Sequence, residues 1–311
     1  MSNGWYQKDI LSVEQFNKAD LRLITQLAHK MRQLVNQKGG NDSLKSKIMT
    51  ALFYEASSRT FGSFIAAMQR LGGGIIPIQG VQYSSVSKGE QLVDTVRTFA
   101  SFSDVIVLRH PEVGSAKLAA EFCDKPLING GDGVGEHPTQ ALLDFFTISG
   151  HFDGVKGLTI AFVGDLLNGR TMHSLSKLLS LYTPIKMYFI SPHILKLPPE
   201  IKTKLTRRKV KVIESEKLDE VLNSTDVLYI TRVQKERFTD LEMYESVKHR
   251  YVITPKILKS AKKTAIIMHP FPRVGEITLD VDLDKRAVYV TEQMKNGMYI
   301  RMALLSLLLT R

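Results

Sequence analysis

The sequence predicts an α/β protein with two doubly wound parallel-sheet domains and a C-terminal helix that returns to the first domain. The first observation is that short apolar runs alternate with longer helical patterns, which indicates strand–helix–strand units. The second is that several runs are nearly continuous in Ile, Val, Leu and Phe, as strands covered on both faces tend to be. The third is the length of 311 residues, which favours two compact domains.

Nine apolar runs are predicted to be strands, in two series separated by the polar, glycine-bearing segment 150–157. The first series is Ile48–Tyr54, Ile75–Ile78, Val105–Leu108 and Leu127–Ile128. The second series is Thr159–Val163, Met187–Ile190, Val210–Ile213, Val227–Ile230 and Ile266–Met268. The two series predict a first domain over residues 1–149, a second over 150–290, and a segment 291–311 that packs back on the first.

Helical spacing of apolar residues marks the two ends of the chain. Near the N-terminus, Ser12 and Gln15 have the spacing of a capping box, and apolar residues then recur from Leu21 to Met31. We therefore predict one helix that begins at Ser12. The segment Met298–Leu309 is predicted to be an apolar helix.

Composition narrows the class of protein. The apolar fraction of 43% and charged fraction of 23% are ordinary for a globular protein. The single cysteine, Cys123, excludes a disulfide framework and a multi-cysteine zinc site, and it favours a reducing compartment. No secretory signal and no apolar run of about 18 residues is found, so a cytoplasmic location without membrane contact is expected.

The formal charge of +11 is compatible with nucleic-acid binding, with a cleft that attracts small anions, or with a solvated basic face. The run Arg207–Lys211 favours the solvated face, because runs of like charge are commonly exposed. No recognised nucleic-acid-binding motif is present, so no nucleic-acid partner is expected.

The sharpest local motif is Ser57-Ser58-Arg59-Thr60, which follows the first predicted strand and precedes a helix. Free N–H groups and the helix dipole at such a helix start suit a phosphate, and Arg59 would add charge-assisted hydrogen bonds. The alternative is a Ser/Thr helix cap beside an incidental arginine. The motif alone favours neither interpretation.

A second motif, His137-Pro138-Thr139-Gln140, places a histidine at another helix start, because proline suits the first helical position. A neutral imidazole there can donate a hydrogen bond to a carbonyl oxygen. The alternative is a structural capping histidine, which is the commoner role of an isolated His-Pro pair.

Three further segments follow predicted strands of the second series. Gly164–Arg170 lacks the glycine spacing of a dinucleotide site, but it places Arg170 at the carboxyl edge of a sheet, where ligands bind. In Thr231–Arg237, Arg232 and Gln234 would face the same side and could hold a carboxylate; the alternative is a solvated loop. His269–Arg273 has two prolines and is either a shaped site loop or a rigid turn.

These segments, in order from about Tyr6 to Leu309, resemble the aspartate/ornithine carbamoyltransferase family. Ornithine enzymes carry a His-Cys-Leu-Pro motif where this chain has His269-Pro270-Phe271-Pro272. That difference, together with Arg232 and Gln234, favours the aspartate branch. The resemblance implies a transferase that moves the carbamoyl group of carbamoyl phosphate to L-aspartate, an early step of pyrimidine biosynthesis, with no metal and no cofactor.

The resemblance also assigns residues to carbamoyl phosphate. Thr60, Arg109 and His137 would polarise the carbamoyl oxygen, with Arg59 also catalytic, and Gln140 and the backbone near Pro272 would contact the carbamoyl amine. The full carbamoyl phosphate set is Ser57, Ser58, Arg59, Thr60, Arg109, His137, Gln140 and Pro272.

The aspartate carboxylates would be held by Lys88, Arg170, Arg232 and Gln234. In the family, the residues that match Ser84 and Lys88 enter the site of the neighbouring subunit, which implies a homotrimer with shared active sites. Glu55 would bridge the two domains through Arg170 and Arg237 when they close.

The chain departs from many bacterial members at Phe61, where a second arginine is common, and at Ser58, where threonine is usual. Phe61 is therefore given no ligand role. The sequence is closer to eukaryotic versions, including the domain embedded in multifunctional pyrimidine proteins, so other domains of that pathway are candidate partners. The alternatives are another carbamoyltransferase, a catalytically silent relative and a nucleic-acid binder.

Overall fold

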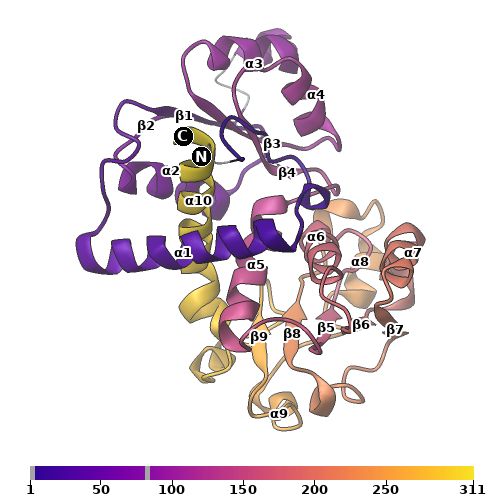
Figure 1. The fold of residues 1–311 in the computed structure, drawn as a ribbon. Helices are drawn as coiled ribbons and strands as arrows, with labels where there is room; N and C mark the ends of the chain where they lie inside the picture. The colour runs from indigo at the N-terminus through magenta and orange to yellow at the C-terminus, as the bar shows by residue number, and fades with distance from the viewer. Residues whose placement is uncertain (1–3, 81–84) are drawn as a thin grey trace. The chain divides into compact units, whose positions relative to one another are not determined.

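The structure, a computed structural model, describes residues 4–80 and 85–311 (Figure 1). It divides into two compact units, the first made of Met1–Phe146 with Lys295–Arg311 and the second of Thr147–Met294. Each unit is built around one sheet whose strands are all parallel. The predicted α/β class with two parallel sheets is confirmed.

The first sheet has the strand order β2-β1-β3-β4, so the chain starts in the interior and winds outward in both directions. In Figure 1, helices α3 and α4 lie on one side of this sheet and α1 and α2 on the other. The strands are β1 (Ile48–Phe53), β2 (Gly74–Gln79), β3 (Val105–His110) and β4 (Leu127–Asp132). The helices that connect them are α2 (Ser58–Arg70), α3 (Leu92–Ala100) and α4 (Ser115–Glu121).

The N-terminal helix differs from its prediction. The capping box of Ser12 and Gln15 is formed, but it caps only a short 3₁₀ turn, Val13–Gln15. The long helix α1 (Lys18–Lys38) starts later, and Asn17 and Asp20 form a second capping box there. The two are separated because Phe16 is extended and buried, with its ring stacked on Trp5 at 5.3 Å between centroids.

The C-terminal helix α10 (Met294–Leu309) belongs to the first unit except for its first residue. It is buried along almost its whole length, as expected for a helix that is apolar on most sides. The backbone N–H of Gln7 donates to the carbonyl of Leu308 at 3.0 Å, which ties the two ends of the chain together. The return of this helix to the first unit was predicted.

The second sheet has the order β7-β6-β5-β8-β9, again starting in the interior. Its strands are β5 (Thr159–Val163), β6 (Lys186–Ile190), β7 (Lys211–Ser215), β8 (Val227–Ile230) and β9 (Ile266–Met268). All nine predicted strands are therefore present, with differences only at their ends. The helices that accompany them are α5 (Pro138–His151), which contains the boundary between the units, α6 (Arg170–Leu179), α7 (Pro199–Arg207), α8 (Leu241–Val247) and α9 (Pro255–Leu258).

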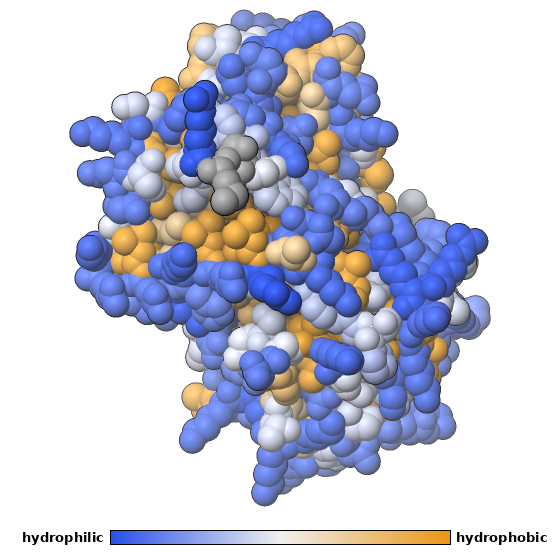
Figure 2. All heavy atoms as spheres, viewed as in Figure 1, coloured by the Kyte–Doolittle hydropathy of each residue, from blue (hydrophilic) through white to orange (hydrophobic). Residues whose placement is uncertain are grey.

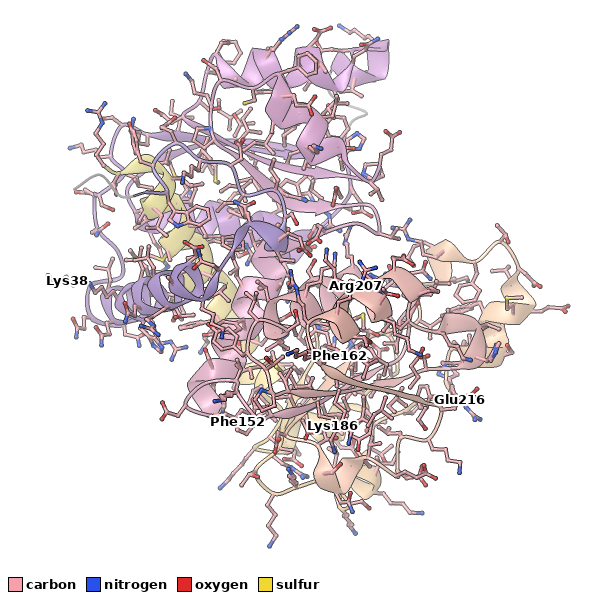
Figure 3. All side chains as sticks on the ribbon, turned by 45° about the vertical axis from the view of Figure 1, so that its right-hand side comes forward. Lys38, Phe152, Phe162, Lys186, Arg207 and Glu216 are labelled. Atoms are coloured by element: carbon pink, nitrogen blue, oxygen red, sulfur yellow. The ribbon has the colours of Figure 1, made fainter. Side chains whose placement is uncertain are left out.

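Each sheet has a hydrophobic core. In the second unit, Phe162 lies within the sheet (Figure 3), and its ring stacks on Phe189 at 5.4 Å and meets Tyr229 edge-on at 5.6 Å. All three rings are buried. Such clusters fix the strands, and hence the loops at their carboxyl ends, in place.

The surface is mostly hydrophilic, as the content of charged residues suggests. Figure 2 shows hydrophilic residues over most of the visible face, with smaller hydrophobic areas between them. In the basic run, Arg207, Lys209 and Lys211 are exposed, so the solvated-face interpretation of this run is confirmed. Within the described residues, no helix is both long enough and apolar enough to span a bilayer.

Candidate active site

The motif Ser57–Thr60 lies where β1 feeds α2. Ser57 is the N-cap of α2 by its backbone, with φ −159° and ψ 90°, but within the described chain its side chain makes no capping hydrogen bond. The simple capping interpretation therefore fails for this hydroxyl. Ser58 and Arg59 are exposed, whereas Thr60 is buried. The first turn of a 13-residue helix, where N–H groups have no partner within the helix, thus lies beside two hydroxyls and a guanidinium, as an anion site requires.

The second motif meets the first. The Nε2 atom of His137 lies 3.4 Å from the Oγ1 atom of Thr60, although the two residues are 77 positions apart in the sequence. Both side chains are buried, and the carbonyl of His137 accepts the first hydrogen bonds of α5, from Gln140 and Ala141 at 3.1 Å. Two helix N-termini and an imidazole are therefore brought together in the first unit.

Arg109 lies at the end of β3, paired in the sheet with Phe53 of β1. Its guanidinium forms an ion pair with Glu55, 2.7 Å between Nη2 and Oε2, and donates to the carbonyl of Gly130 at 3.2 Å. The residue is 9% exposed. These bonds fix the guanidinium at the edge of the sheet where the Ser57–Thr60 segment begins.

Phe61, the departure from bacterial relatives, has a packing role. Its ring meets Phe53 edge-on at 5.1 Å between centroids, and the side chain is half-buried. Phe53 is fully buried at the end of β1. The aromatic pair anchors the first turn of α2 on its strand, which agrees with giving Phe61 no ligand role.

In the second unit, the loop between β5 and α6 is organised by Asp165. This carboxylate accepts hydrogen bonds from the backbone and side-chain amide of Asn168 at 3.0 and 3.2 Å, and from the backbone N–H of Gln234 at 3.3 Å. The Gln234 side chain donates to the carbonyl of Asn168 at 2.9 Å. Burial raises the pKa of Asp165, and these hydrogen bonds partly offset that effect. Two segments that were predicted separately are thus joined around one carboxylate.

Gly164 permits that close approach. Its φ is 120°, and a Cβ atom at this position would lie 2.1 Å from the carbonyl oxygen of Thr231. The hydroxyl of Thr231 in turn donates to the carbonyl of Val163 at 3.1 Å. Only glycine meets both the backbone angle and the spacing here.

Three arginines of the second unit are candidates for binding anions. Arg232 is held by Glu236 in a two-point ion pair, with 2.9 Å between Nη1 and Oε2. That carboxylate raises the pKa of Arg232 although burial opposes it. Arg170 is half-buried at the start of α6, and Arg237 is exposed in a 3₁₀ turn (Lys235–Arg237). The guanidinium of Arg232 is therefore already oriented by a local partner.

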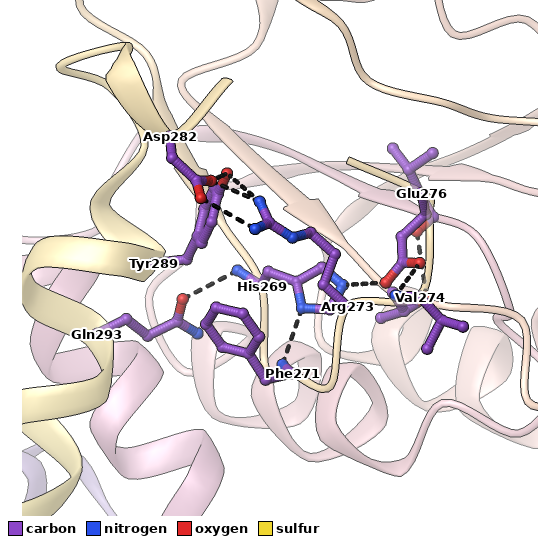
Figure 4. Close-up of polar contacts among 10 residues, drawn as sticks. His269, Phe271, Arg273, Val274, Glu276, Asp282, Tyr289 and Gln293 are labelled. Carbon is purple, nitrogen blue, oxygen red and sulfur yellow. Dashed lines mark hydrogen bonds and ion pairs between the residues drawn. The ribbon is translucent and has the colours of Figure 1, made fainter. Parts of the chain in front are cut away.

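The turn His269–Arg273 is rigidly built (Figure 4). The Nδ1 atom of His269 accepts from the backbone N–H of Phe271 at 2.8 Å, so its proton lies on Nε2, which donates to Glu276 at 2.6 Å. Burial pushes the pKa of Glu276 upward, but the hydrogen bonds from His269 and from the backbone N–H of Val274 outweigh this effect, so the pKa of Glu276 is lowered. The Phe271–Pro272 peptide bond is cis, as the two prolines suggested.

The same turn has a second anchor. Arg273 donates to Asp282 at 2.9 Å, and the hydroxyl of Tyr289 also donates to Asp282. The backbone of His269 donates to the side chain of Gln293 at 2.9 Å. The backbone around Pro272 is thereby held in one conformation, which is the property that a site loop needs.

Three predicted residues of the first unit remain: Glu55, Ser84 and Lys88. Lys88 ends a 3₁₀ turn (Ser85–Lys88) and is exposed. Ser84 lies outside the described residues. Glu55 pairs with Arg109 as described above, and its bridge to Arg170 and Arg237 stays a prediction. Within residues 4–80 and 85–311, no group of three or more His, Cys, Asp or Glu side chains is arranged to hold a metal ion.

Sequence reasoning gave no role to two buried carboxylates. Asp165 follows a strand and a glycine, and Asp144 stands four residues after Gln140 on the same helix face. Both are fully buried, and both bind a predicted site residue: Asp165 binds Gln234 and Asp144 binds Gln140. The i, i+4 spacing of Gln140 and Asp144 was a usable signal.

His173 fixes the start of α6 from inside the second unit. It is buried, and its Nε2 atom donates to the carbonyl of Leu166 at 2.7 Å. Burial lowers the pKa of His173 to about 4. The folded state therefore holds this imidazole neutral over a pH range in which the unfolded chain protonates it.

A pH-dependent loss of stability follows from that difference. Because the unfolded chain binds the proton first as pH falls below about 6.5, the free energy of unfolding drops between that value and the pKa of about 4. We expect this group to remove about 2 kcal/mol between pH 7 and pH 5. His173→Gln should lack this part of the pH dependence in urea unfolding curves. Equal pH dependence in both proteins would contradict the assignment.

Comparison with known proteins agrees with this geometry. Residues 8–150 match the family model of the aspartate/ornithine carbamoyltransferase carbamoyl-P binding domain, and residues 156–308 match that of the Asp/Orn binding domain. The chain belongs to the aspartate/ornithine carbamoyltransferase family. The family resemblance noted from the sequence is confirmed.

Relatives within the carbamoyltransferase family fall into two kinds. The aspartate carbamoyltransferase catalytic subunit of Thermococcus kodakarensis is 46% identical over 305 residues, which are 98% of each chain. The multifunctional protein pyr1-3 of Dictyostelium discoideum is 50% identical over 305 residues, 98% of this chain. This chain spans only 14% of the length of that multifunctional relative.

A solved carbamoyltransferase structure shares the fold. Aspartate transcarbamoylase from Trypanosoma cruzi, in complex with carbamoyl phosphate and aspartate, superposes with a TM-score of 0.95 at 42% identity. The match covers 99% of this chain and 98% of that chain. The two parallel-sheet α/β domains of this chain therefore have the fold of that enzyme.

Proposed function

We propose that this chain is an aspartate carbamoyltransferase, which transfers the carbamoyl group of carbamoyl phosphate to the amino nitrogen of L-aspartate. The observation that carries the proposal is the contact between Thr60 and His137, which unites the two helix starts. The names and ligands of the relatives described above support it.

The first unit binds carbamoyl phosphate in this proposal. The phosphate oxygens accept hydrogen bonds from the N–H groups and hydroxyls of Ser57, Ser58 and Thr60. They also accept hydrogen bonds from the guanidinium groups of Arg59 and Arg109. The carbamoyl oxygen accepts from Thr60, Arg109 and His137. Gln140 and the backbone near Pro272 accept from the carbamoyl amine. The buried pair of Arg109 and Glu55 supports this assignment, because it fixes a cation at the sheet edge.

The second unit binds aspartate. The two carboxylates of aspartate are bound by Arg170, Arg232 and Gln234, with Lys88 from the first unit. The oriented guanidinium of Arg232 supports this role. The absence of the ornithine-type cysteine, replaced here by Pro270, supports aspartate as the acceptor. In this proposal, Glu55 forms a bridge to Arg170 and Arg237 when the two domains close.

The reaction is an acyl transfer. The deprotonated aspartate amine attacks the carbamoyl carbon, the C=O electron pair moves to oxygen, and a tetrahedral oxyanion forms. The oxyanion electron pair then re-forms the C=O bond as the C–O bond to phosphate breaks. Phosphate leaves with the electrons of that bond and accepts the proton released by the amine. Preorganised donors aimed at the oxyanion stabilise it by roughly 3–4 kcal/mol each, and holding both substrates together adds orientation.

The assembly is part of the proposal. The active protein is a homotrimer in which Ser84 and Lys88 of one chain complete the site of the next. Other domains of pyrimidine synthesis are candidate partners, because multifunctional relatives match this chain over 98% of its length. A cytoplasmic location stays a prediction.

The deciding experiment is a carbamoyl-transfer assay with carbamoyl phosphate, in which L-aspartate and L-ornithine are offered separately. We expect N-carbamoyl-L-aspartate from aspartate and no product from ornithine. Product from ornithine would retain the phosphate site but contradict the acceptor. No product from either, with carbamoyl phosphate still bound, would point to a different acceptor or a silent relative.

A further inference from the structure

The side-chain amide of Gln140 is oriented from within its own helix. Its Nε2 atom donates to Oδ1 of Asp144 at 3.0 Å, one turn further along α5. Gln140 is 9% exposed and Asp144 is fully buried. Because a carboxylate offers only acceptors, it must take the NH₂ end of the amide. The carbonyl oxygen of Gln140 is then the end that remains for a ligand.

Asp144 is supported by a buried cation from the other end of the chain. Arg301 of α10 is 3% exposed and attracts Asp144 electrostatically. Burial lowers the pKa of Arg301 to about 9, an effect that Asp144 opposes, so the guanidinium stays charged near neutral pH. Arg301 therefore provides a positive charge near the carboxylate of Asp144.

The surroundings of Arg301 connect the two helices that begin at the phosphate site. Its guanidinium lies over the ring of Phe64 in α2, 5.0 Å from the centroid. It also folds back on its own helix, where a Cβ atom at Gly297 would lie 2.5 Å from Nη1. Helices α2, α5 and α10 therefore meet at one buried cation.

Stability alone does not explain such a pair. Burying two charges costs several kcal/mol per ion, and apolar residues of similar size are often as stable or more so. A buried hydrogen bond such as that between Gln140 and Asp144 does, however, specify one arrangement of the polar groups around it. Here the group that it specifies is the amide of Gln140.

We propose that Asp144 and Arg301 are positioning residues, which hold the carbonyl oxygen of Gln140 toward the ligand so that the site selects a carbamoyl NH₂ group over a methyl group. This inference rests on the proposed function, because it assigns the carbamoyl amine to Gln140. A carbamoyl amine has N–H donors that need an acceptor. A flipped amide would present its own NH₂ group and lose that hydrogen bond.

The test compares two stable phosphonates that differ only at this group. Phosphonoacetamide carries NH₂ beside its carbonyl, and acetonylphosphonate carries CH₃ there. In Asp144→Asn the new amide can donate as well as accept, so Gln140 is no longer fixed. We expect the Kd of phosphonoacetamide, measured by calorimetry on the full chain, to rise about tenfold. The Kd of acetonylphosphonate should change by less than about twofold.

Two controls separate positioning from a general structural effect. The readout is the ratio of the phosphonoacetamide Kd to the acetonylphosphonate Kd. In a Gln140→Ala background, Asp144→Asn should no longer change this ratio, because Asp144 acts through Gln140. Arg32→Gln removes an arginine that packs on Phe146 and Tyr299 of the same two helices without serving Asp144. Arg32→Gln should leave the ratio of the phosphonoacetamide Kd to the acetonylphosphonate Kd unchanged, whereas Arg301→Gln should raise that ratio.

The outcomes are distinguishable. An unchanged ratio in Asp144→Asn, or an equal change in the Gln140→Ala background, would overturn the inference. If Asp144→Asn does not fold, Arg301→Gln takes its place with the same readouts, because glutamine removes the positive charge that acts on Asp144. Failure of the wild-type chain to transfer carbamoyl to aspartate would instead contradict the proposed function, whatever the ratio of the phosphonates.

Discussion

His137→Ala is expected to lower kcat about a hundredfold, because one donor to the developing oxyanion is worth a factor of this order. The structure places Nε2 of His137 against Thr60 at a helix start, where it can donate to the carbamoyl oxygen. Carbamoyl phosphate should bind almost normally, since in the proposed site its phosphate is held by Arg59, Arg109 and the N-terminus of α2. Steady-state kinetics with aspartate, together with the Kd of phosphonoacetamide, measure the two effects separately.

Two further variants sharpen this test. His29→Ala removes an exposed imidazole that meets the buried ring of Phe146 edge-on at 4.7 Å in the same unit, so it controls for the loss of an imidazole outside the candidate site. It should leave kcat unchanged. His137→Gln restores a donor and should recover part of the rate. Unchanged turnover in His137→Ala would show that the imidazole is structural.

A mixture of two inactive variants is expected to regain activity, which is the second large effect. Lys88→Ala should be impaired about 10- to 100-fold, because an ammonium group that binds an anion is lost. If Lys88 serves the neighbouring chain, a mixed trimer with His137→Ala contains one site that has both native residues. Random mixing should therefore give about a quarter of the wild-type activity.

The measurement requires dissociation and reassembly of the mixed chains, followed by the same assay. Each variant treated alone is the control and should stay inactive. A mixture that is no more active than its parents would place Lys88 and His137 in the same chain's site, or would indicate that no trimer forms. Light scattering of the wild-type chain distinguishes these two explanations.

The sequence predicted the elements of this fold well where one local signal dominated. The nine predicted strands are present, and the helix predicted after Ser57–Thr60 is α2, which buries Phe64, Ala67 and Met68. These predictions succeeded because burial places apolar residues at the regular spacings of strands and helices, which can be recognised in the sequence. The prediction for the N-terminal helix was wrong because two capping boxes compete there. Only the packing of Phe16 on Trp5 decides in favour of the second.

The same division holds at the candidate site. The sequence by itself determined the family and the chemistry that its motifs offer: hydroxyls and an arginine at one helix start, and a histidine at another. It could not decide whether Ser57 was a simple cap, because that depends on where its hydroxyl points. Nor could it show that Asp165 joins two loops, since the hydrogen bond to Gln234 spans 69 positions.

Only the tertiary structure decided which groups meet. The contact of Thr60 with His137, the pair of Glu55 with Arg109, and the support of Asp144 by Arg301 all join separate elements. No local pattern encodes such a contact, because its partners are selected by the sheet register and by helix packing. A buried polar group must still find a partner, and the fold determines which one it finds.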